Sequence, residues 1–156
     1  MEYIASQRKL TELLAQHGFN IKKSFGQNFL IDKNILKKIV ATSGITKDVI
    51  ALEIGPGVGS LTQFLSVAAK EVYCFEIDHK LEALLEDTLG PCENTTVIFA
   101  DFLKQDLATW YEPLKGEEIK VIANLPYYIT TPIIEKLIIW YVTEQPNLTS
   151  ATVMMQ

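Results

Sequence analysis

The sequence predicts an α/β fold in which a mostly parallel sheet carries helices on both faces. Two observations lead to this prediction. From Val49 onward, apolar segments of strand length alternate with segments whose apolar residues recur at helical spacing. The first segment, residues 49–54, is almost wholly apolar, which is typical of a parallel strand buried between two layers. Alternating strands and helices then imply parallel neighbours joined by crossover helices.

Two helices are predicted before the first strand. The first covers residues 6–17, where leucines recur at helical spacing and Gly18 provides a C-terminal stop. The second follows Asp32, an N-cap candidate, and ends at Gly44. In an open α/β sheet such a preceding segment can lie over the ligand crevice, so we expect residues 1–47 to form an extension that covers the site.

Residues 48–156 are expected to form the sheet domain itself. Its predicted strands lie near residues 49–54, 71–77, 95–100, 119–123 and 150–155. Its predicted helices lie near residues 60–69, 79–89, 103–111 and 131–142. Ligands of open parallel sheets bind beyond the carboxyl ends of the strands. The residues that follow each strand are therefore the candidates for function.

The first strand ends in an acid and a glycine loop. Glu53 precedes Gly55, Gly57 and Gly59, and glycines let a backbone turn tightly and approach a ligand without a Cβ in the way. Dinucleotide loops follow the pattern G-x-G-x-x-G, but Ser60 occupies the position of the third glycine. An acid ahead of the loop suits an ammonium or sulfonium ligand better than a pyrophosphate. The motif favours S-adenosylmethionine, and a purely structural turn is the alternative.

Acids also follow the second and third strands. Glu76 comes 17 residues after Gly59, close to the distance at which an acid binds the ribose hydroxyls of a nucleoside, whereas Asp78 is placed to cap the next helix. Asp101 could accept a hydrogen bond from the exocyclic amine of adenine, with Phe102 packed near the ring. Helix capping is the alternative role for each acid.

The fourth strand runs into Asn124-Leu125-Pro126-Tyr127. The Asn124 side-chain oxygen and the Leu125 carbonyl could each accept one N–H of an adenine amino group and so orient its nitrogen. Pro126 biases the preceding residue toward an extended conformation. Tyr127 offers a ring on which an extruded base can stack. A turn with a packed aromatic residue is the structural alternative.

Composition narrows the class of protein. The 156 residues are enough for one domain with a substantial core, and no apolar run reaches the ~20 residues that a bilayer requires. The two cysteines have neither a disulfide pattern nor metal-ligand spacing, so we expect a reduced, cytoplasmic protein without a metal.

Charge is distributed unevenly along the chain. Residues 1–47 carry eight Lys or Arg against three acids, whereas residues 48–156 carry six against sixteen. The basic extension is a candidate surface for nucleic acid.

Four motifs in order identify a resemblance. They are Ser24-Phe25-Gly26-Gln27-Asn28-Phe29-Leu30, Glu53-Ile54-Gly55-Pro56-Gly57-Val58-Gly59, Phe75-Glu76-Ile77-Asp78 and Asn124-Leu125-Pro126-Tyr127. Together they closely resemble the ribosomal RNA adenine N6,N6-dimethyltransferase family, above all its bacterial small-subunit members, over about residues 16–156. The resemblance implies a Rossmann-like methyltransferase fold that binds S-adenosylmethionine and releases S-adenosylhomocysteine. It also implies dimethylation of two adjacent adenosines in a hairpin near the 3′ end of 16S rRNA in immature small subunits.

The resemblance assigns roles to individual residues. Those implied to bind the cofactor are Gln27, Asn28, Leu30, Glu53, Gly55, Gly57, Glu76, Ile77, Asp101, Phe102 and Asn124. Those implied to form the catalytic site are Asn124, Leu125, Pro126 and Tyr127. The family usually continues past Gln156 with further strands and a helical C-terminal domain that helps to bind RNA. A sheet truncated after its fifth strand would expose an apolar edge, so we expect self-association.

Three other functions compete with this one. The related adenine dimethylases of 23S rRNA, which confer macrolide resistance, share the same motifs. A noncatalytic RNA-binding or transcription-factor relative would keep the fold, but intact Glu53, Glu76 and Asn124 argue against a decayed site. A nicotinamide dehydrogenase is disfavoured by Ser60 and by the lack of a histidine placed for hydride transfer.

Overall fold

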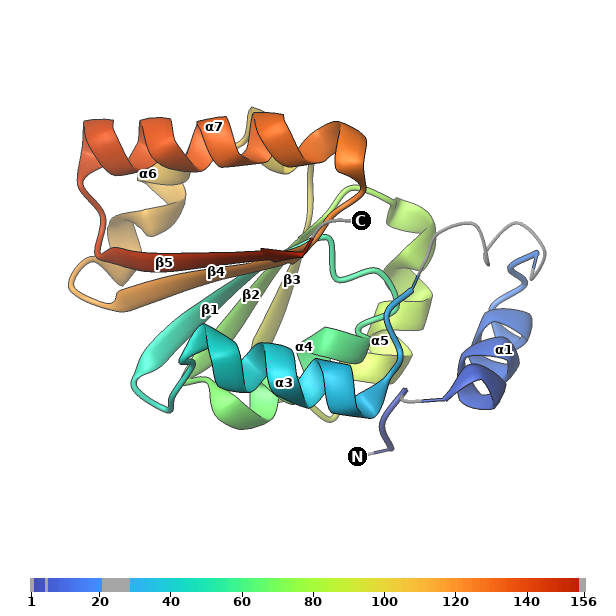
Figure 1. The fold of residues 1–156 in the computed structure, drawn as a ribbon. Coiled ribbons are helices and arrows are strands. Elements are labelled where there is room, and N and C mark those ends of the chain that lie inside the picture. Colours follow the sequence, from blue (N-terminus) through green and yellow to red (C-terminus); the bar gives the residue numbers. More distant parts are fainter. Residues whose placement is uncertain (1, 5, 21–28, 155–156) are drawn as a thin grey trace.

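The computed structural model describes residues 2–4, 6–20 and 29–154, and within them one five-stranded sheet organises the chain (Figure 1). All neighbouring strands are parallel, in the order β3-β2-β1-β4-β5. The strands are β1 (Val49–Ile54), β2 (Glu71–Glu76), β3 (Thr95–Phe99), β4 (Glu118–Asn124) and β5 (Leu148–Met154). The order reverses direction at β1, between β2 and β4, and such a switch point is where open sheets bind ligands.

Helices cover both faces of the sheet. The α-helices are α1 (Gln7–Gln16), α3 (Lys33–Ser43), α4 (Ser60–Ala68), α5 (Glu82–Leu89), α6 (Leu107–Tyr111) and α7 (Tyr127–Glu144). Short 3-10 helices are η2 (His79–Leu81), η3 (Phe102–Lys104) and η4 (Glu112–Leu114). In Figure 1, α6 and α7 lie over one face, and α3, α4 and α5 lie over the other, with α1 outermost beside α5.

Successive side chains of the buried strands point to opposite faces of the sheet and form one apolar core on each face. On the face of α6 and α7, Leu52 and Val121 pack with Trp140, and Trp110 and Tyr111 contact that indole edge to face. On the opposite face, inward residues of β1, β2 and β4 pack against α3 and α4. β1 is buried along its whole length, as expected for a strand sandwiched between two layers.

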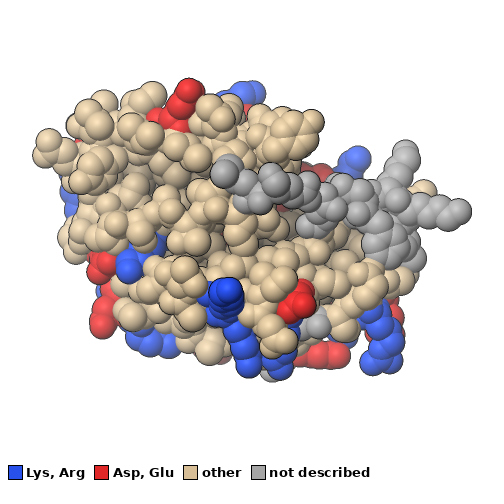
Figure 2. All heavy atoms as spheres, viewed as in Figure 1, with Lys and Arg blue, Asp and Glu red and all other residues tan. Residues whose placement is uncertain are grey.

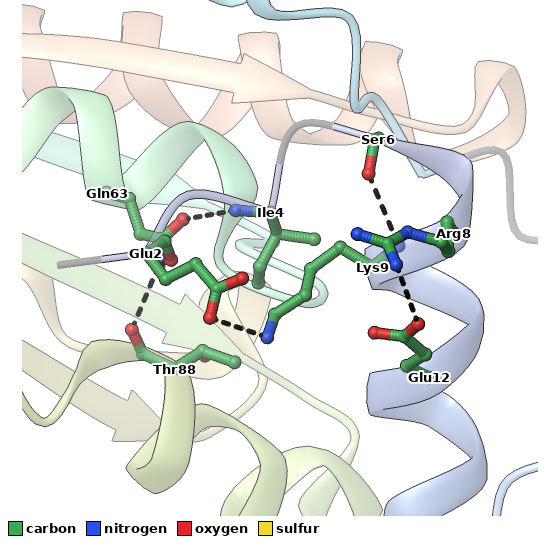
Figure 3. A network of polar contacts seen from close by, with 8 residues as sticks. All are labelled: Glu2, Ile4, Ser6, Arg8, Lys9, Glu12, Gln63 and Thr88. Carbon is green, nitrogen blue, oxygen red and sulfur yellow. Dashed lines mark hydrogen bonds and ion pairs between the residues drawn. The ribbon is translucent and has the colours of Figure 1, made fainter.

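The N-terminal segment is held to the domain by a third apolar cluster and by one buried amide (Figure 3). Leucines of α1 pack against α5. The Gln63 side chain, on α4, accepts a hydrogen bond from the Ile4 amide at 2.9 Å and donates to the carbonyls of Glu2 and Thr88 at 3.1 Å each. A single side chain thus connects the N-terminus, α4 and α5.

The structure confirms the predicted parallel α/β sheet, its five strands and the two helices before it. Asp32 caps α3 through the amides of Asn34 and Ile35, and Gly44 ends that helix in the left-handed conformation. Asp78 accepts from the Lys80 amide at 3.0 Å, the capping role predicted for it. These helix caps could be predicted from the sequence because a capping residue bonds to backbone groups within one turn of itself.

Three helix predictions were wrong in detail, the first being the helix over 79–89, whose first turn is the 3-10 helix η2. α7 begins at Tyr127 and not near residue 131, because Pro126 occupies the N-cap and Thr130 Oγ1 donates to the Pro126 carbonyl at 3.1 Å, so the helix runs through Pro132. The predicted helix over 103–111 is split into η3 and α6, since Asp106 caps a new helix through the amides of Ala108 and Thr109.

The surface is divided by charge. In Figure 2 the face over α7 and β5 is largely uncharged, whereas Lys and Arg gather below, over α3. α3 exposes Lys33, Lys37 and Lys38. Beyond its first turn, which exposes Tyr127 and Tyr128, α7 leaves a row of large apolar side chains exposed: Ile134, Ile138, Ile139, Tyr141 and Val142. Within the described ranges, no helix is long and apolar enough to cross a membrane, and no cluster of His, Cys, Asp or Glu is arranged to hold a metal ion.

Candidate functional site

A cleft of about 500 Å³ opens beyond the carboxyl ends of the strands, at the switch point of the sheet. Its size lies within the usual range for small-molecule sites. The predicted site residues that line it are Leu30, Glu53, Gly55, Gly57, Glu76, Ile77, Asp101, Phe102, Asn124, Leu125, Pro126 and Tyr127. The topology therefore brings together motifs that lie up to about a hundred residues apart in the chain.

The glycine loop after β1 forms the floor of this cleft. Gly55, Gly57 and Gly59 all have positive φ, at 73°, 59° and 83°, a conformation that other residues rarely adopt. A Cβ on Gly57 would also lie 3.1 Å from the Phe29 ring. No side chain caps the first turn of α4, so backbone donors at its N-terminus face the loop.

Glu76, at the end of β2, is fixed by the loop. Its two carboxylate oxygens accept hydrogen bonds from the amides of Gly57, at 3.1 Å, and Asp78, at 2.9 Å. The side chain is buried, and burial raises its pKa, while these backbone donors offset part of that effect. The carboxylate is thus immobilised at the lip of the cleft, with further acceptor capacity on each oxygen for ligand hydroxyls.

Glu53 lies deeper, with only 2% of its surface exposed. It pairs in register with Cys74 on β2, whose thiol contacts Glu53 Oε2 at 3.6 Å. Burial raises the pKa of Glu53 to about 7, and the nearby Thr62 hydroxyl and Cys74 thiol offset only part of that effect. A carboxyl that is desolvated in this way gains from any cation placed near it.

Asp101 and Phe102, after β3, form another wall. Asp101 Oδ1 accepts from the Leu103 amide at 3.0 Å, so the capping alternative describes the structure, and the second oxygen lies 3.9 Å from Lys104 Nζ. From α7, Lys136 Nζ donates to the carbonyls of Leu103, at 2.8 Å, and Gln105, at 2.6 Å.

Lys136 also lies 5.7 Å from the centre of the Phe102 ring. Burial lowers its pKa, and the nearby acids Asp101 and Asp106 oppose that effect. Lys136 thus joins the turn that carries Phe102 to α7, the helix that follows the Asn124 loop (residues 124–127).

The Asn124 loop forms the opposite wall. Asn124 ends β4 with its side chain exposed, and Leu125 is buried and donates its amide to the Met154 carbonyl of β5 at 3.3 Å. Tyr127 begins α7 with 75% of its surface exposed at the cleft mouth. Such exposure is unusual for a large aromatic ring and leaves its face available to a ligand.

The charged side chains that line the cleft are all acidic among the described residues. Four acids line it: Glu53, Glu76, Asp78 and Asp101. Among its described lining residues there is no Lys, Arg or His. Such a cleft attracts a cationic ligand and repels a pyrophosphate or an RNA phosphate. The acid ahead of the glycine loop predicts the same kind of ligand.

Residues 18–156 match the protein family described as Ribosomal RNA adenine dimethylase. The chain belongs to this family. It is 46% identical over 157 residues to the ribosomal RNA small subunit methyltransferase A of Oceanobacillus iheyensis, covering 99% of this chain and 52% of that protein. It is 54% identical over 137 residues to the protein of the same description from Streptococcus gordonii, covering 86% and 47%. The chain therefore spans about half the length of these relatives.

Solved structures agree with this family assignment. The 23S rRNA methyltransferase ErmE superposes with a TM-score of 0.68 at 32% identity, over 83% of this chain and 48% of that one. A dimethyladenosine transferase from Plasmodium falciparum superposes with a TM-score of 0.62 at 29% identity, over 80% and 42%. These neighbours confirm the Rossmann-like methyltransferase fold of this dimethylase-family chain.

Sequence reasoning did not recover the whole cleft. Gln27 and Asn28 lie outside the described residues. Phe29, Ser60 and Tyr128 line the cleft but were not predicted to be part of it. Ser60 Oγ donates to the Leu30 carbonyl at 2.5 Å and so fastens the covering segment to α4. That serine had a signal in the sequence, since it occupies the third-glycine position, but its partner lies 30 residues away.

Proposed function

We propose that this chain is the S-adenosylmethionine-binding, catalytic part of an rRNA adenine dimethyltransferase. Its substrate would be the N6 of two adjacent adenosines in the 3′-terminal hairpin of 16S rRNA. The observation that carries the proposal is the acidic cleft between the glycine loop and the Asn124 loop, in a chain of the rRNA adenine dimethylase family. The relatives with 46% and 54% identity are both described as small-subunit enzymes, which favours 16S over 23S rRNA.

The residues of the cleft fit S-adenosylmethionine. Its positively charged sulfonium and ammonium groups suit a cleft that is lined by four acids and, among the described residues, by no Lys, Arg or His. Glu76, already held by two amides, would accept from the ribose hydroxyls. Asp101 would use its second oxygen for the adenine amine beside Phe102, and Ile77 would pack on the adenine ring. Gly55 leaves open space where a side chain would stand, which suits close approach of the methionine part.

The Asn124 loop would prepare the nucleophile. The amino nitrogen of adenine is a weak nucleophile because its lone pair is delocalised into the ring. Asn124 and the Leu125 carbonyl would each accept one N–H and concentrate electron density on nitrogen, while Pro126 stiffens the loop and Tyr127 stacks on the extruded base. When bound, S-adenosylmethionine supplies a methyl group that is already activated, so the chain needs to supply position and exclusion of water. Asn124 is neutral and would not act as a base; the proton can pass to water.

The N-terminal residues 1–47 would act as a cover and an RNA contact. Phe29 packs over Gly57 and the Leu30 carbonyl is fixed by Ser60, which supports a covering role for the segment that also contains Gln27 and Asn28. The exposed lysines of α3 would meet RNA phosphates outside the acidic cleft. Residues 48–156 would form the methyltransferase domain.

The same proposal implies where the chain acts and what it binds. The chain would act in the cytoplasm on the immature small subunit. β5 is an edge of the described sheet and adjoins the exposed apolar side chains of α7, so this chain would self-associate through that edge. Sedimentation that shows a monomer at all concentrations would contradict the self-association.

The variant Asn124→Ala tests the catalytic assignment. We expect it to lose methyl transfer to a 16S hairpin while it binds S-adenosylmethionine as the wild type does. Transfer to immature small subunits, compared with naked 23S rRNA, decides between the two rRNA substrates. Near-normal transfer by Asn124→Ala would overturn the role of this loop, and a preference for 23S rRNA would overturn the substrate.

A further inference from the structure

We propose that Tyr128 is a second stacking platform, which holds the base of the nucleotide next to the target adenosine. The inference rests on the proposed function and adds to it a subsite for the neighbouring nucleotide. Tyr127 and Tyr128 stand side by side in the first turn of α7, with 75% and 72% of their surfaces exposed. Both line the mouth of the cleft. Two adjacent rings left in water at a ligand site are a surface on which planar groups can bind.

The geometry of the two rings assigns them to different bases. Their centroids lie 5.8 Å apart and their planes are inclined at 86°. Stacking requires nearly parallel planes, so one base cannot stack on both rings at once. If Tyr127 takes the extruded adenine, the face of Tyr128 remains for another base. Because the two rings are nearly perpendicular, consecutive bases that stack on them cannot stay stacked on each other and must be splayed apart.

Electrostatics indicate that a base occupies this subsite and a phosphate does not. The cleft below the rings is lined by four acids and by no described Lys, Arg or His, which repels the backbone of the RNA. The uncharged face of a nucleobase can enter where a phosphate cannot. Stacking on an aromatic side chain tolerates any base and is worth about 1–3 kcal/mol per base, or roughly 5- to 150-fold in affinity.

The backbone that carries the Tyr128 ring is held by two hydrogen bonds. Tyr128 lies in the helical turn that Pro126 opens, where the Ile129 amide and the Thr130 hydroxyl both donate to the Pro126 carbonyl, at 3.2 and 3.1 Å. The backbone beneath the ring is thus fixed relative to the Asn124 loop. For a substrate with two consecutive adenosines, Tyr128 would hold the second base while the first one reacts.

A binding cycle tests the proposal with the 156-residue chain. The probes are three fluorescent RNA hairpins: one with two consecutive adenosines, one with an abasic site at the target and one with an abasic site beside it. We expect Tyr128→Ala to weaken binding of the intact hairpin roughly 5- to 150-fold but to leave the affinity for the neighbour-abasic hairpin unchanged. Tyr128→Phe should bind all three as the wild type does, because the ring is retained. Tyr141→Ala, on the same helix outside the cleft and 54% exposed, is the matched control.

The outcomes separate the inference from the proposed function. Equal weakening of the intact and neighbour-abasic hairpins by Tyr128→Ala, or no weakening of either, overturns the second platform. If Tyr127→Ala still weakens binding of the intact hairpin but not of the target-abasic one, the proposed function stands without the second platform at Tyr128. Wild-type affinity that is the same for all three hairpins, or no binding of any, overturns both.

Discussion

The substitution Gln63→Leu removes a side chain that joins the N-terminal segment to α4 and α5 (Figure 3). Leucine keeps much of the volume of glutamine but none of its hydrogen bonds. The Ile4 amide and the Thr88 carbonyl would lose their partners at buried positions, whereas Glu2 is exposed and its carbonyl can turn to water. Each unpaired buried group costs about 1–3 kcal/mol, so we expect the free energy of unfolding to fall by roughly 2–6 kcal/mol.

Urea denaturation followed by circular dichroism measures this loss. With a slope near 2 kcal/mol per molar urea, typical for small proteins, the midpoint should drop by about 1–3 M. Gln16→Leu, at an exposed position of α1, is the control and should leave the midpoint nearly unchanged. If Gln63→Leu unfolds at the same midpoint as Gln16→Leu, the N-terminal segment does not depend on this amide, and the reasoning is refuted.

Two further predictions concern charged groups. Because the pKa of Glu53 is raised to about 7 in the folded state, the folded state holds its proton while the unfolded state releases it near 4.5, so stability falls as pH rises through this window. The stability of Glu53→Gln relative to the wild type should therefore rise by roughly 2–3 kcal/mol from pH 5 to pH 8 in urea unfolding. The same stability difference at both pH values would contradict this. Lys136→Met should weaken S-adenosylmethionine binding about tenfold in calorimetry, since the turn that carries Phe102 loses two hydrogen bonds. Lys104→Met, whose side chain is 83% exposed, is its control, and equal weakening by both variants would argue against a positioning role for Lys136.

The fold was predictable because its determinants are local. Apolar runs such as residues 49–54 mark buried strands, and Asp32, Gly44 and Asp78 mark helix ends within a turn of chain. The start of α7 was not predictable in this way. Pro126 and Pro132 are both compatible with a helix start, and the chain uses the first because Thr130 and Ile129 bond its carbonyl.

The cleft was predictable to the extent that it is built from strand ends. Parallel strands bring their carboxyl ends to one edge, so the acids and glycines that follow β1, β2 and β3 had to lie near the Asn124 loop. Contacts made by side chains across the fold left no local pattern. The packing of Phe29 on Gly57 and the reach of Lys136 to Leu103 depend on the packing of distant elements.

Titration calorimetry of S-adenosylmethionine into the wild type and into Glu76→Ala tests the central claim most directly, with NADH as the competing ligand. We predict saturable binding of S-adenosylmethionine by the wild type, no binding of NADH, and loss of S-adenosylmethionine binding in a Glu76→Ala variant that circular dichroism shows to be folded. Binding of NADH, or undiminished binding of S-adenosylmethionine by Glu76→Ala, would contradict the assignment of this cleft.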